Sequence, residues 1–99
     1  MNKYSLDVSY WEMDERRMLC GPNDQYLKLL ENEFDCQLVF DDNSLICLGE
    51  NELCLKVIKN CYSLMEQTHQ LSLSDVQYLC NLVKKYPYSK KLHFSNEPI

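Results

Sequence analysis

The residues best suited to binding chemistry surround one glycine turn. Gly21 is one of only two glycines, and Pro22 suits the first turn of a helix, where its missing N–H is not needed. The free N–H groups and the dipole at a helix N-terminus attract phosphate. Cations on both sides of the turn would line a groove beside it. The candidate nucleic-acid-binding residues are therefore Arg16, Arg17, Gly21, Pro22, Asn23 and Lys28.

The same turn also has a purely structural interpretation. Asp24 places a carboxylate where a phosphate would lie, and two like charges in contact repel by about 1 kcal/mol even in water. Pro22 removes one N–H donor. Helix starts are also stabilised by acidic residues of their own. The alternative to a phosphate site is thus an ordinary helix start, and Arg16 and Arg17 are then solvated side chains.

Charge is unevenly distributed along the chain. The net charge of the 99 residues is −5. Residues 1–83 hold 6 basic and 14 acidic side chains, giving −8, whereas residues 84–99 hold 4 lysines and one acid, giving +3. Long-range attraction to a polyanion is therefore not built into most of the chain. The C-terminal lysines alternate with aromatic residues, which is typical of single-strand binding, but lysines also complement the dipole of a helix end.

The residue types do not predict catalysis, a cofactor or a metal. Six cysteines occur without a C-x-x-C pair or a neighbouring histidine, so we expect reduced core thiols and no zinc site. His69 lacks an evident catalytic partner, and Trp11 and the tyrosines are expected to be packing residues. The chain has no N-terminal apolar run and no stretch of about 20 apolar residues. We therefore expect a cytoplasmic, non-enzymatic protein without membrane contact.

Hydrophobic periodicity predicts the elements that position the turn. Alternation of Tyr4, Leu6, Val8 and Tyr10 indicates a strand over residues 3–10. Asp14 is expected to cap a short helix through Leu19. Helical spacing predicts a second helix from Pro22 to about Asp35. Two strands, 37–40 and 44–48, should form a hairpin through the polar turn 41–43.

Two further helices follow the hairpin. Asn51 is expected to cap the first, whose apolar stripe includes Val57, Ile58 and Cys61. The second should begin with the capping box Ser74-Asp75-Val76-Gln77 and stop before Pro87. The predicted class is α+β: a three-stranded sheet covered on one face by helices, in the order β-α-α-β-β-α plus a C-terminal helix. We expect one domain over residues 1–86 and a tail or linker over 87–99.

This order resembles the KH fold, in which two helices flank a loop that grips nucleic-acid backbone. The sequence is more similar to the KH-like N-terminal domain of PhoH-like proteins. Three segments carry the resemblance: Leu19-Cys20-Gly21-Pro22-Asn23-Asp24 followed by Leu27-Lys28-Leu29-Leu30-Glu31, then Ser44-Leu45-Ile46-Cys47-Leu48-Gly49, then Leu71-Ser72-Leu73-Ser74-Asp75-Val76. The resemblance implies an accessory domain that binds single-stranded RNA and is associated with a P-loop ATPase domain in cis or trans.

The chain itself has no G-x-x-x-x-G-K-[ST] motif, so the family's ATP hydrolysis is not expected of it. The alternative function is a protein-interaction module that keeps the KH-like fold without nucleic-acid binding. The acidic balance of residues 1–83 and the carboxylate of Asp24 favour this alternative.

Overall fold

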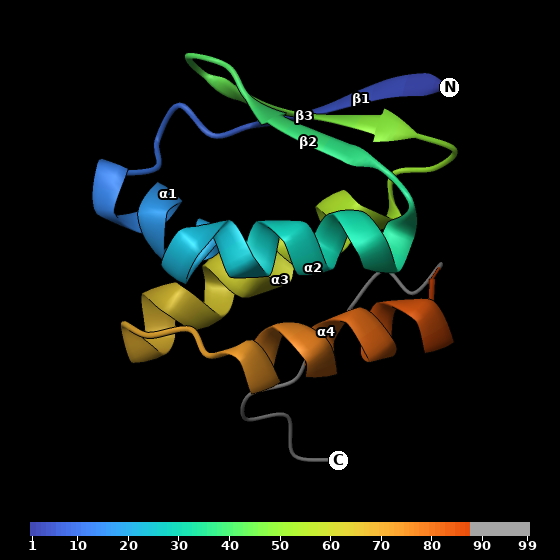
Figure 1. Ribbon diagram of the computed structural model, residues 1–99. Helices are drawn as coiled ribbons and strands as arrows, with labels where there is room; N and C mark the ends of the chain where they lie inside the picture. Colours follow the sequence, from blue (N-terminus) through green and yellow to red (C-terminus); the bar gives the residue numbers. More distant parts are fainter. Residues whose placement is uncertain (88–99) are drawn as a thin grey trace.

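A three-stranded antiparallel sheet is covered on one face by helices in the computed structural model, which describes residues 1–87 (Figure 1). The predicted α+β class and element order are confirmed. The elements are β1 (Asn2–Asp7), α1 (Met13–Cys20), a 3-10 turn (Pro22–Asp24), α2 (Gln25–Phe34), β2 (Gln37–Phe40), β3 (Ser44–Gly49), α3 (Leu53–Thr68) and α4 (Leu73–Lys85).

The sheet has β3 at its centre, between β1 and β2. Alternate residues of β3 point towards the helices, and Leu45 and Cys47 are fully buried there. In the register of the sheet, Leu38 of β2 lies opposite Cys47 and Leu6 of β1 lies opposite Leu45, so both belong to the same inner face. None of the helices in residues 1–87 covers the opposite face (Figure 1), and Val39 on that face is 50% exposed.

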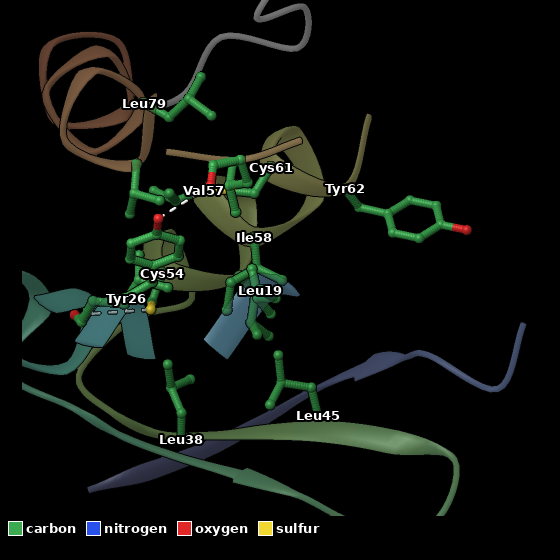
Figure 2. Packing of buried hydrophobic residues seen from close by; sticks show 14 of the residues in the cluster. Leu19, Tyr26, Leu38, Leu45, Cys54, Val57, Ile58, Cys61, Tyr62 and Leu79 are labelled. Carbon is green, nitrogen blue, oxygen red and sulfur yellow. Dashed lines mark hydrogen bonds between the residues drawn. The ribbon is translucent and has the colours of Figure 1, made fainter. Parts of the chain in front are cut away.

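The helices form two layers beneath the sheet. α1, α2 and α3 lie next to it, and α4 packs on the far side of α2 and α3 (Figure 1). The predicted stripe of α3 is buried at Val57, Ile58 and Cys61, and the apolar face of α4 is buried as expected. Figure 2 shows leucines of the sheet pointing into the same cluster as these helices. Each large side chain buried in this way contributes about 1.5–3 kcal/mol.

The first strand is shorter than predicted. It ends at Asp7, whose Oδ1 accepts a hydrogen bond from Ser9 N–H at 3.0 Å and turns the chain. Val8 is still buried, but Tyr10, predicted to continue the buried face, is 61% exposed. The Asp7 carboxylate thus offers the backbone a local hydrogen bond in place of continued strand structure, as short polar side chains often do.

Two helix starts differ from the predicted ones. α1 begins at Met13 after Glu12, whose N–H donates to Glu15 Oε1 at 2.8 Å, so Asp14 lies inside the first turn instead of capping it. The capping box of α4 is formed by Ser72 and Asp75, two residues before the predicted Ser74-to-Gln77 pair.

The start of α3 and the end of α4 are close to the predicted positions. Asn51 Oδ1 accepts from Leu53 N–H at 3.0 Å at the start of α3, although Glu52 occupies the N-cap position. α4 ends at Lys85, two residues before Pro87.

The predicted C-terminal tail lies almost entirely outside the described residues. Lys84, Lys85 and Tyr86 are described, whereas the rest of the predicted basic and aromatic cluster is not: Tyr88, Lys90, Lys91 and Phe94. Within residues 1–87, no helix has the length and apolar character needed to cross a bilayer.

Candidate nucleic-acid interface

The glycine turn has an unusual backbone. Gly21 has φ 76° and ψ 176°, a conformation that only glycine adopts readily. Asn23 and Asp24 follow in the left-handed region, with φ 54° and 59°. Residues 22–24 therefore form a separate 3-10 turn and α2 begins at Gln25, so the prediction of a continuous helix from Pro22 is wrong. Asparagine and aspartate tolerate this region better than other non-glycine residues.

Gly21 is required by a close contact with Tyr26. A Cβ placed at Gly21 would lie 2.5 Å from Cγ of the Tyr26 ring. Tyr26 is buried, and its hydroxyl donates to Leu71 O at 3.1 Å, which ties the start of α2 to the segment before α4 (Figure 2). The sequence pattern predicts a binding role for the turn. The structure adds a packing role, because Gly21 leaves room for the Tyr26 ring.

A groove of about 480 Å³ runs from this turn to the end of β2. We call it the arginine groove. Met13 lies on the wall of the groove and is 65% exposed. Phe40, the last residue of β2, also lines the groove, so the sheet forms part of its wall. Its lining is mostly apolar and consists of Met13, Arg16, Arg17, Cys20, Gly21, Asp24 and Phe40.

Arg16 acts as a tether between elements distant in sequence. Its Nη2 donates to Val8 O at 3.1 Å and to Asp42 O at 3.0 Å, and its guanidinium lies 5.7 Å from the centre of the Phe40 ring. These contacts join α1 to the segment after β1 and to the hairpin turn. The guanidinium therefore has a structural role, and a substitution at Arg16 would change stability as well as binding.

Arg17 is the accessible cation of the groove. Its side chain is 77% exposed and lies 3.9 Å from Asp14 in an i,i+3 pair. Exposed pairs of this kind contribute at most about 1 kcal/mol, so the guanidinium can exchange Asp14 for another anion at little cost.

The predicted site residues are divided between two hollows. Arg16, Arg17 and Gly21 line the arginine groove. Pro22, Asn23 and Lys28 line a second hollow of about 610 Å³, which also involves Leu73 and Gln77 of α4. The turn therefore separates the six residues instead of gathering them around one ligand.

Asp24 gives the arginine groove a negative charge at the glycine turn. Burial, and secondarily the carboxylate of Asp24, raise the pKa of the Cys20 thiol, so this thiol is protonated at neutral pH.

Sequence reasoning missed Phe40 and Met13 as lining residues of the arginine groove. The available signal for Phe40 was its place on the inner face of β2, next to the hairpin turn.

Comparison with models of protein families finds no match to this chain, and comparison with curated proteins finds no similar sequence.

Proposed function

We propose that this chain is a KH-like accessory domain of PhoH type that binds single-stranded RNA in the arginine groove and works with a P-loop ATPase domain in cis or trans. The observation that carries the proposal is the groove itself. It lies beside the glycine turn, between α1 and the end of β2, with the exposed Arg17 at its rim. KH domains hold single strands beside a glycine loop between two helices.

The lining suits a single strand in two ways. Arg17 offers a charge-assisted contact to a phosphate. The apolar wall, which includes Met13 and Phe40, offers packing to an unstacked base. Neither contact involves bond making or breaking, so the proposal assigns the domain no chemistry, and ATP hydrolysis would belong to the associated domain.

Arg17→Glu should weaken binding of a fluorescent single-stranded RNA about tenfold, which corresponds to ~1.4 kcal/mol. Fluorescence anisotropy at low salt measures the affinity. Lys28→Glu is the matched control, because Lys28 is also exposed and the net charge changes equally, but it lies in the second hollow. Equal losses in both variants, or no binding by the unmodified chain, would contradict the proposed site.

A second candidate, a protein-interaction module, is favoured by the position of Asp24 in the groove and by the net charge of −5. Asp24→Asn separates the two functions, because asparagine tolerates the left-handed conformation and removes only the charge. If RNA binds in the groove, affinity should rise about fivefold, from the loss of ~1 kcal/mol of repulsion. If the groove serves a protein, RNA binding should be negligible before and after the substitution.

A further inference from the structure

The β2 edge of the sheet is protected by a side chain. Leu38 N–H points away from β3, and it donates to Glu31 Oε2 at 2.9 Å. The carboxylate of α2 thus satisfies a backbone donor that another strand would need. Proteins commonly protect exposed edges with charged side chains in this way.

Within residues 1–87, no side chain protects the β1 edge in this way. Val8 N–H donates to Asn43 O at 2.9 Å, in register with the β1–β3 ladder, so the even-numbered residues of this segment face β3. The N–H groups of Lys3, Ser5 and Asp7 therefore point outward, and none of them finds an acceptor within residues 1–87. A six-residue strand with an open edge is a template for an added strand.

A second copy of β1 fits this edge better than an arbitrary strand. Antiparallel pairing centred on Ser5 puts Lys3 of each copy opposite Asp7 of the other. The outward-pointing backbone N–H and C=O groups of one copy then face those of the other copy, as an antiparallel ladder requires. Opposite charges at facing positions stabilise a strand pair, whereas pairing centred on Lys3 or Asp7 would oppose like charges.

Both charged groups are available for this pairing. Lys3 is exposed and forms no ion pair with any residue of the described range. Asp7 is also exposed, and although Ser9 contacts its carboxylate, no cation of the described residues pairs with it.

The inner face of the strand is compatible with the same register. Tyr4 and Leu6 point towards the helix side but remain half-buried. In the pairing centred on Ser5, Tyr4 of each copy lies opposite Leu6 of the other. Leu6 lines a hollow of about 320 Å³ together with Tyr10, Trp11 and Tyr62, which offers an aromatic surface to the incoming tyrosine.

We propose that the chain forms a symmetric dimer in which β1 pairs antiparallel with β1 of a second copy, centred on Ser5, to give a continuous six-stranded sheet. The interface is self-complementary, as two-fold symmetry requires. The arginine groove is built from α1, the glycine turn and β2, so dimerisation does not depend on the function proposed for it.

Sedimentation equilibrium of the full chain tests the dimer. The apparent mass should rise with concentration from 11.8 kDa towards twice that value. A salt concentration near 0.15 M is suitable, because the Debye length of about 8 Å screens the repulsion between the two net charges. A chain that stays monomeric up to the highest soluble concentration would overturn the proposal.

Charge reversal tests the register. Lys3→Asp and Asp7→Lys should each weaken self-association at least tenfold, because each puts like charges opposite one another at both ends of the strand pair. An equimolar mixture of the two variants should associate again, since every facing pair is then of opposite charge. Lys28→Asp makes the same charge change elsewhere and should leave the dimer intact. A mixture that associates no better than either variant alone would exclude this register.

Ser5→Pro tests the edge itself. The substitution removes the central outward-facing N–H but no hydrogen bond of the β1–β3 ladder, and proline is tolerated at a sheet edge. Dimerisation should be lost while the circular dichroism spectrum stays native, and Ser5→Ala should retain the dimer. A dimer that survives Ser5→Pro would place the interface elsewhere. If Ser5→Pro does not fold, the mixing experiment decides.

Discussion

Replacing Gly21 by alanine should lower the free energy of unfolding by about 3 kcal/mol or more. An alanine at φ 76° and ψ 176° is in a region that costs about 1–3 kcal/mol for a residue with a Cβ. Its Cβ would also lie 2.5 Å from the Tyr26 ring, and relieving such overpacking typically costs another 1–3 kcal/mol. Because small domains are stable by only about 5–15 kcal/mol, a large part of the stability would be lost.

Urea denaturation of Gly21→Ala, Tyr26→Ala and the double variant separates the two contributions, because alanine at position 26 lacks the Cγ and Cδ atoms that the added Cβ would meet. If the contact with the ring dominates, the cost of Gly21→Ala should fall clearly when Tyr26 is already alanine. If the backbone conformation dominates, the two costs should add. Tyr26→Phe, which keeps the ring and loses only the hydrogen bond to Leu71, should cost about 1 kcal/mol. A loss below 1 kcal/mol for Gly21→Ala would contradict the packing described for the turn.

Periodicity predicts the fold of this chain well because the fold depends on repeated patterns. The stripe of α3, the apolar face of α4 and the hairpin each rest on several residues that indicate the same face. Helix starts depend on one or two residues, and the chain offers competing acceptors close together. Ser72 and Ser74 both have a candidate partner three residues later, and in the structure Ser72 and Asp75 form the capping box.

The candidate site was predictable only in part, because its contacts join residues distant in sequence. That Arg16, Arg17 and Gly21 lie near one another follows from α1 ending at the turn. The acceptors that hold Arg16 lie 8 residues before and 26 residues after it, and no local pattern indicates them. Lys28 lies in another hollow, on the helix that follows the 3-10 turn, and the continuous-helix prediction did not include that turn.

The six cysteines are unpaired in the structure, and four of them are buried. Burial in apolar surroundings raises the pKa of all four thiols, because the charged thiolate is disfavoured there. The pKa of Cys80 rises to about 11 and that of Cys47 to about 12, with smaller contributions from Glu33 and Cys36 respectively. Cys54 and Cys61 are shifted upward further still, again mainly by burial.

The buried thiols should make the fold sensitive to alkaline pH. Above the ordinary thiol pKa near 9, the unfolded chain releases these protons while the folded chain keeps them, so the free energy of unfolding falls as pH rises. The stabilising contribution is complete below pH 9 and is lost as the pH approaches the folded-state values. Each retained proton corresponds to about 1.4 kcal/mol per pH unit, so Cys54 and Cys61 alone give about 3 kcal/mol per unit. We expect the free energy of unfolding to fall by several kcal/mol between about pH 9 and 11.

Urea titrations at pH 7, 9, 9.5 and 10 in the presence of a reductant measure this slope. Cys61→Ala should flatten the pH dependence by about 1.4 kcal/mol per unit, because one titrating thiol is removed. Val57→Ala truncates another fully buried side chain of the same helix. It should lower the free energy of unfolding by the same amount at every pH, so the pH dependence should stay as in the unmodified chain. A free energy of unfolding that stays constant from pH 9 to 10 would mean that these thiols ionise equally in the folded and unfolded chain. That result would contradict the burial of the thiols described here. If the dependence of the free energy of unfolding on pH weakens equally in Cys61→Ala and Val57→Ala, the alkaline sensitivity does not come from the Cys61 thiol.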